Sequence, residues 1–178
     1  MNTTAQPTKT SITTKRLFKL ALFCLLFILF MYLYASLDRR TATNHKPFHD
    51  SMVIATFQPD GSFLALPYHY LQQHPISNSS FLAKAPSGEK EKNGNETITY
   101  KVIAQQNQQQ TMQTILRAPN QITIARYTAS NSTITPIEST VYNVQTLIMS
   151  TLSALIILLL LQIWLKWQHR RRLAAEKQ

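Results

Sequence analysis

Two long apolar runs, one near each end of the chain, dominate its hydropathy pattern. The first covers residues 17–37 and carries no charge from Leu20 to Leu37. The second covers residues 144–166 and is uncharged until Lys166. A helix rises 1.5 Å per residue, so an uncharged run of about 18 residues covers about 27 Å, close to the thickness of the hydrocarbon core. Because a helix satisfies its own backbone hydrogen bonds in lipid, both runs are predicted to be transmembrane helices.

A cleaved signal peptide is the alternative interpretation of the first run. Basic residues precede it, as they do in signal peptides. The apolar run is nevertheless long for a signal peptide, and residues 33–35 do not form a small-residue cleavage site. We therefore expect an uncleaved anchor.

The distribution of basic residues predicts how the chain is oriented. Lys and Arg are more frequent in the two terminal tails than in those parts of residues 38–143 that adjoin the spans. By the positive-inside rule, both tails (residues 1–16 and 167–178) face the cytoplasm, and residues 38–143 lie outside it. Tryptophans at the end of the second span fit the inner membrane interface. The residues expected to anchor the chain are Lys15, Arg16, Trp164, Lys166, Trp167, Arg170, Arg171 and Arg172.

The segment between the spans alternates apolar and polar residues, which is typical of strands. Residues 51–57 and 62–66 flank a Gln-Pro-Asp-Gly turn in which Gly61 is expected to have a positive φ. Residues 98–104, 111–118 and 122–127 predict an antiparallel meander, and a short helix is expected between Pro67 and Pro75. Residues 87–95 are interpreted as a solvated loop, 107–110 as a hairpin tip and 128–140 as an extended approach to the second span.

The expected fold is thus a membrane protein in which two transmembrane α-helices flank a small β-rich domain, an antiparallel sheet with an α+β arrangement as the alternative. The net charge of +10 comes mostly from the two tails, where membrane topology accounts for it. No nucleic acid partner is therefore expected. The single cysteine, Cys24, lies in the first span, so the outer segment has no disulfide. A bacterial periplasm does not require one, and the predicted location is a bacterial inner membrane.

His45, His49 and Asp50 have a spacing that resembles a metal-binding motif. Two histidines four residues apart meet only on a helix, and Pro47 between them disfavours one. We expect solvated or capping side chains here and no metal or cofactor.

Catalytic motifs are not found in the sequence. The three glycines, Gly61, Gly88 and Gly94, are explained by turns, and the acidic residues are scattered. An enzyme is not expected.

The spans carry a pattern suited to helix packing. Phe23, Phe27, Phe30 and Tyr34 lie on one face of the first span, and small residues Ser150 and Ala154 lie four apart on the second. Small residues let helices approach closely in lipid. These six residues are candidates for a helix-packing seam, between the spans or with a partner.

The predicted function is that of a non-enzymatic accessory or assembly protein that presents a periplasmic domain to a membrane complex. The predicted partners are the lipid bilayer and a membrane protein or a second copy of the chain. The alternative is a membrane-anchored ligand or stress sensor that acts through a partner protein.

Overall fold

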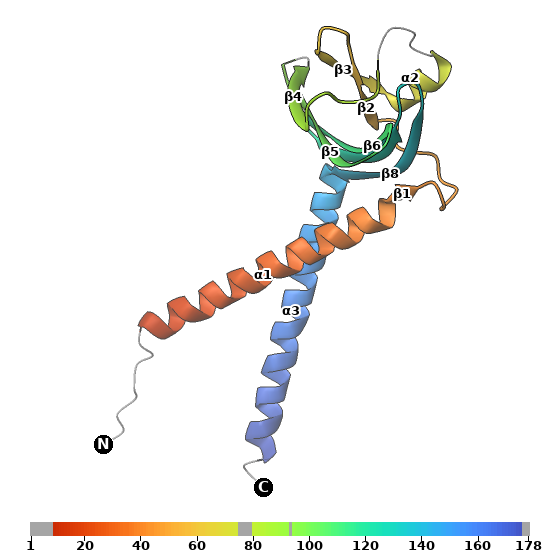
Figure 1. Cartoon of the computed structure of the whole chain (residues 1–178). Helices are drawn as coiled ribbons and strands as arrows, with labels where there is room; N and C mark the ends of the chain where they lie inside the picture. Colours follow the sequence, from red (N-terminus) through yellow and green to blue (C-terminus); the bar gives the residue numbers. More distant parts are fainter. Residues whose placement is uncertain (1–8, 75–79, 93, 176–178) are drawn as a thin grey trace. The chain divides into compact units, whose positions relative to one another are not determined.

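The computed structural model describes residues 9–74, 80–92 and 94–175 (Figure 1). Two compact units divide the chain: Ala35–Val144 form the first, and the two long terminal helices form most of the second. Residues 1–8 and 176–178 of the predicted tails lie outside the described residues. The elements are α1 (Lys9–Asp38), β1 (Arg40–Thr41), β2 (Val53–Phe57), β3 (Phe63–Pro67), α2 (Tyr68–Gln73), β4 (Ser87–Lys92), β5 (Glu96–Gln106), β6 (Gln109–Ala118), β7 (Gln121–Ala129), β8 (Ile134–Asn143) and α3 (Val144–Ala175).

The terminal helices α1 and α3 contain two stretches that are long and apolar enough to cross a membrane, Arg16–Asp38 and Val144–Ala175. Their large apolar side chains are mostly exposed, with Leu25, Ile28, Leu155 and Ile156 each more than half accessible. Water would disfavour so much apolar surface, whereas lipid would not. The two long apolar helices, which precede and follow the antiparallel domain in the sequence, are therefore suited to membrane anchoring.

The predicted antiparallel sheet is confirmed in the unit between the helices. Six strands follow the order β1-β8-β7-β6-β5-β4, and every neighbouring pair is antiparallel. Strands β5, β6 and β7 form the expected meander. Strands β2 and β3 form the expected hairpin, with Phe57 opposite Phe63, and Gly61 in its turn has φ +89°. The hairpin is a two-stranded sheet of its own, which was not predicted. The expected short helix is α2, which ends at Gln73.

Three segments that were not predicted as strands belong to the sheet: Arg40–Thr41 (β1), Ser87–Lys92 (β4) and Ile134–Asn143 (β8). The prediction of a solvated loop at 87–95 is wrong, because Ser87–Lys92 pairs with β5 as the edge strand β4. Its charged residues do not alternate with apolar ones, so no strand pattern marks it, although charge is common on exposed edge strands. Residues 134–143, predicted in part as an extended approach to the second span, form strand β8, which pairs with β7.

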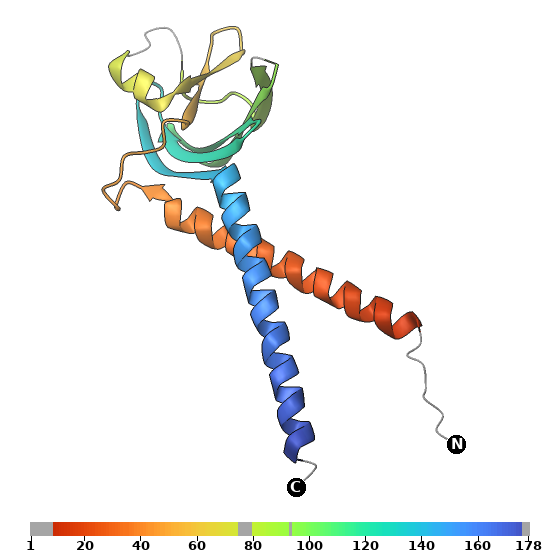
Figure 2. The ribbon, with the colours of Figure 1, turned by 180° about the vertical axis from the view of Figure 1, so that it is seen from behind.

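The core lies between the hairpin and the concave face of the curved sheet, as Figures 1 and 2 show. On the hairpin side, Met52, Ile54 and Phe57 pack against Tyr100, Met112 and Tyr127 of the sheet. All five residues of β2 are buried, because the strand is covered on both of its faces. Phe57, Phe63 and Tyr100 form an aromatic group with ring centroids 5.0–6.2 Å apart.

Buried polar side chains fix the hairpin and a loop onto the sheet. The Tyr127 hydroxyl accepts hydrogen bonds from the Ala55 amide and the Thr114 hydroxyl, both at 3.1 Å. Burial raises the pKa of Tyr127, which keeps the phenol neutral. The Gln110 carboxamide accepts from the Ala83 amide at 2.8 Å and donates to the Ala83 carbonyl at 3.0 Å. These contacts join the β2–β3 hairpin and the loop at Ala83 to the six-stranded sheet.

Candidate functional site

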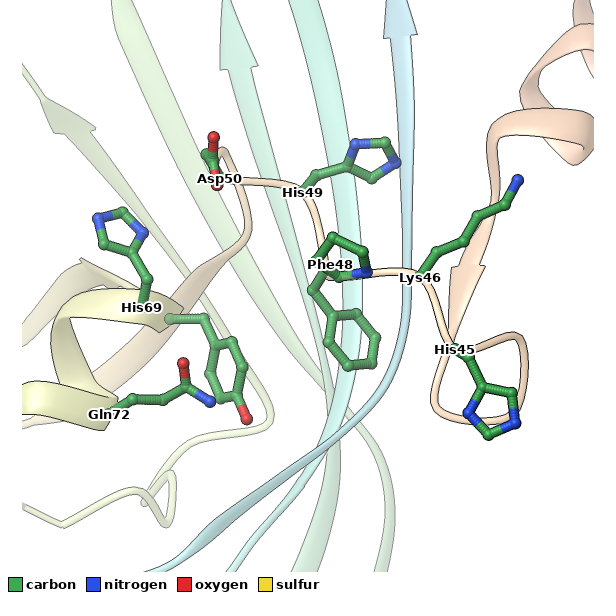
Figure 3. A pocket seen from close by; sticks show the side chains of 9 residues that line it. His45, Lys46, Phe48, His49, Asp50, His69 and Gln72 are labelled. Carbon is green, nitrogen blue, oxygen red and sulfur yellow. The ribbon is translucent and has the colours of Figure 1, made fainter.

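An open pocket of about 540 Å³ lies in the domain where the segment before β2 meets α2 (Figure 3). The sequence brings the two walls together because the β2–β3 hairpin returns the chain to its starting end, with Val53 opposite Pro67. Both walls carry aromatic side chains and side chains that contain nitrogen. The lining residues are His45, Lys46, Pro47, Phe48, His49, Asp50, Tyr68, His69 and Gln72.

The first wall is an irregular loop held by Asn44. Its side-chain oxygen accepts from the amides of Thr41 at 3.2 Å and Lys46 at 3.3 Å, and its amide nitrogen donates to the Arg39 carbonyl at 2.9 Å. His45 follows with φ 54°, a left-handed conformation that non-glycine residues rarely adopt. In Figure 3 the His45 ring lies at the opposite end of the loop from Asp50.

His49 makes hydrogen bonds to residues outside the loop. Its backbone amide donates to the Ser139 hydroxyl at 3.4 Å. Its ring Nε2 lies 3.1 Å from the Asp38 carbonyl oxygen and 3.6 Å from the Asp38 carboxylate. A carbonyl oxygen only accepts, so this contact requires the tautomer in which Nε2 carries the proton. The ring therefore has a structural partner outside the pocket.

The candidate metal ligands share the pocket but do not converge. His49 points toward β8 and His45 points the opposite way from Asp50 and His69 (Figure 3). Within the described ranges, no three His, Cys, Asp or Glu side chains are placed to hold a metal ion. His69 and Asp50, which face the same side of the pocket, come from different walls.

The pocket combines an apolar wall with polar side chains. Phe48 and Tyr68 form an edge-to-face pair with centroids 6.0 Å apart, which gives the pocket an apolar wall. Lys46, His69 and Gln72 supply hydrogen-bond donors among the lining side chains, against one lining carboxylate, that of Asp50. Sequence reasoning identified His45, His49 and Asp50 but missed Phe48, Tyr68 and Gln72, because only the hairpin brings the two walls together.

The candidate helix-packing residues lie on α1 and α3. Phe23 stacks on Phe27 at 6.3 Å and Phe30 on Tyr34 at 6.1 Å, each within α1. On α3, Ser150 and Ala154 are fully buried, while most of the helix is exposed. Beside them, the Ser153 hydroxyl lies 2.7 Å from the hydroxyl of Tyr34.

The candidate membrane anchors occupy helical positions. Lys15 and Arg16 lie in the second turn of α1, and Lys166 and Arg170 lie near the end of α3. Trp164 and Trp167 are about half exposed, and the Arg171 guanidinium lies 3.6 Å from the Trp167 ring centroid. Arg172 lies in the last turn of α3.

The outer, convex face of the sheet carries an ion-pair group that sequence reasoning did not find. Glu138 of β8 bonds both Arg39 and Arg126, the latter at 3.2 Å from its cross-strand position on β7. The Arg117 guanidinium on the same face donates to the Thr99 hydroxyl at 3.2 Å.

Comparison with family models, with curated proteins and with solved structures finds no match to this chain.

Proposed function

We propose that the chain is a non-enzymatic inner-membrane accessory or assembly protein that presents residues 38–143 to a membrane complex in a bacterial periplasm. The observation that carries the proposal is the contrast between its helices and its domain. The helices expose large apolar side chains, which lipid or another protein could cover, while the domain buries its own hydrophobic core. The protein thus holds a folded domain at a membrane surface.

The buried small residues of α3 support helix-mediated assembly. Ser150 and Ala154 are covered although their neighbours Leu152 and Leu155 are half exposed. In lipid, close helix contacts rely on such small residues because apolar burial gives no driving force there. The hydrogen bond between Tyr34 and Ser153 adds a polar contact beside them.

Crosslinking in native membranes followed by mass spectrometry tests the proposal. We expect reproducible crosslinks from residues 38–143 to one or a few membrane proteins, or between copies of this chain. Ser150→Leu with Ala154→Leu keeps α3 apolar but should weaken those crosslinks, whereas Leu159→Ala with Leu160→Ala, at exposed positions, should not. A monodisperse monomer without crosslinked partners would contradict assembly.

A fusion experiment tests the orientation. Alkaline phosphatase joined after Gln178 should be inactive, because that end is expected in the cytoplasm, and a fusion near Gly94 should be active. The reverse activities would overturn the periplasmic location.

A ligand or stress sensor that acts through a partner is the second proposed function, and the pocket favours it. Its volume of about 540 Å³ lies within the range of small-molecule sites, and an aromatic wall faces several donors. Titration of the full chain with small organic acids, followed by thermal unfolding, should give a shift that His69→Ala and Lys46→Ala reduce. No shift with any compound would remove this support.

A further inference from the structure

The end of the sheet that leads into α3 presents a partly apolar outer surface. Thr97, Arg117, Ile122 and Tyr142 are cross-strand partners on β5, β6, β7 and β8, and they form what we call the outer row. Their strand neighbours Ile98, Leu116, Thr123 and Val141 are buried, so alternation places the outer row on the convex face. Ile122 is 40% exposed, which leaves a large apolar side chain at the surface of this row.

The next row on the same face is also partly apolar. Thr99, Ile115, Ile124 and Thr140 are partners across the same four strands. The isoleucines of this second row are half-buried and lie side by side on β6 and β7. Neighbouring strands are about 4.8 Å apart, so each row is about 14 Å long.

Chain connectivity ties this end of the sheet to the spans. Tyr142 is two residues before Val144, the first residue of α3, so their Cα atoms lie within about 7 Å. Arg40, two residues after the end of α1, pairs with Ser139 on the same strand. Both spans therefore join the sheet on the second half of β8, at points about 14 Å apart.

The charge of the outer face matches phosphate groups. Lys101, Arg117 and Arg126 project on this face from β5, β6 and β7 and are exposed. Glu138 of β8 is already bonded by two arginines, and Glu89 lies on β4, at the opposite edge of the sheet from β1 and β8. Isoleucine, tyrosine and arginine together are typical of the layer between hydrocarbon and water, where apolar side chains enter and basic groups meet phosphate.

From these observations we infer that the outer row rests in the phospholipid headgroup layer of the bilayer that holds α1 and α3. The inference deepens the proposed membrane anchoring and rests on it. The area of the two rows favours lipid over a protein partner: about 14 Å by 7 Å is roughly 100 Å², against about 800 Å² per partner in a standard protein interface. The contact would hold the domain at a fixed height and limit which face a partner can reach.

Depth-dependent quenching on the full chain tests this inference. Cys24→Ser removes the single cysteine, and Ile122→Cys provides a labelling site for an environment-sensitive nitrobenzoxadiazole dye. The protein is reconstituted in vesicles of phosphatidylcholine and phosphatidylglycerol that contain headgroup-spin-labelled lipid. Gln108→Cys is the matched control, because it lies in the β5–β6 turn, at the opposite end of β6 from Ala118.

We expect the dye at position 122 to be quenched several-fold more strongly than the dye at position 108. Arg117→Gln should reduce quenching at position 122 when phosphatidylglycerol is present and have little effect in pure phosphatidylcholine. Equal quenching at both positions would overturn the inference. A blue-shifted dye at position 122 without lipid quenching would also overturn it, since protein would then cover the row.

Alkaline carbonate extraction of the same vesicles separates this inference from the anchoring on which it rests. Release of the protein into the soluble fraction would show that the anchoring itself fails. Retention in the membrane with equal quenching would show that only the placement of the outer row is wrong.

Discussion

The two units of this chain use the same kinds of side chain in opposite ways. In α1 and α3, residues such as Leu25 and Leu155 face outward, and the small residues Ser150 and Ala154 are covered. In the domain, large side chains such as Tyr127 are covered and the outward positions are mainly polar. The difference shows that side-chain size and polarity gain meaning only with the surrounding solvent: water drives large apolar groups inward, and lipid does not.

The largest effect is expected from a charge placed at an outward-facing position of a span, where lipid would tolerate it less than water does. Leu155→Asp puts a carboxylate at a half-exposed position near the middle of α3, where insertion into lipid would cost about 3 kcal/mol. We expect a large loss of protein from the membrane fraction, measured by carbonate extraction and immunoblotting.

Leu64→Asp is the control, because Leu64 is similarly exposed but belongs to β3 of the domain. It should leave the membrane fraction unchanged. If Leu155→Asp also leaves it unchanged, that face of α3 does not contact lipid.

Removal of one buried hydroxyl should have the next largest effect. Tyr127→Phe leaves the Ala55 amide and the Thr114 hydroxyl without their buried acceptor, which should lower the free energy of unfolding by about 1–3 kcal/mol. Thermal unfolding of the full chain in detergent micelles measures the loss.

Tyr70→Phe, at an exposed position of α2, should have little effect in the same experiment. Equal melting temperatures for wild type and Tyr127→Phe would mean that water or another group replaces the phenol oxygen.

The parts that could be predicted from sequence are those with strong local patterns. The meander and the β2–β3 hairpin alternate clearly, and the turn at Gly61 has the residues that its geometry needs. Strand β4 could not be predicted, because Ser87–Lys92 is nearly all polar and becomes a strand only by pairing with β5. Gly88 lies there for a tertiary reason: an added Cβ would lie 2.4 Å from the Tyr100 ring.

The candidate pocket was predictable only in part. His45, His49 and Asp50 are close in sequence, so their proximity was evident. The second wall, which includes His69, follows the hairpin, and its position depends on the register in which Val53 meets Pro67. The hairpin itself was predicted, but no local pattern encodes the ring directions that keep the histidines apart.

Backbone strain in the hairpin turn should have a smaller effect than the loss of the Tyr127 hydroxyl. Gly61 has φ +89°, and a Cβ added there would meet no other atom within 4 Å, so a side chain strains the backbone without a clash. Gly61→Val should therefore lower the free energy of unfolding by about 1–2 kcal/mol. Gly61→Asn should cost less, since asparagine tolerates positive φ. Equal melting temperatures for the valine variant and wild type would show that the turn can adopt another conformation.

The smallest effect is expected at the ion-pair group on the outer face of the sheet. Arg126→Gln removes one of the two arginines bonded to Glu138, and Arg39 remains. Because the Arg126 side chain is 46% exposed, solvent screens the pair, and the loss should stay below about 1 kcal/mol. The difference in melting temperature between Arg126→Gln and wild type should shrink further in high salt, since salt screens exposed charges more than buried ones. Lys101→Gln removes a positive charge from the same face and should change stability even less. A loss for Arg126→Gln that persists in high salt would show that Glu138 behaves as a buried charge.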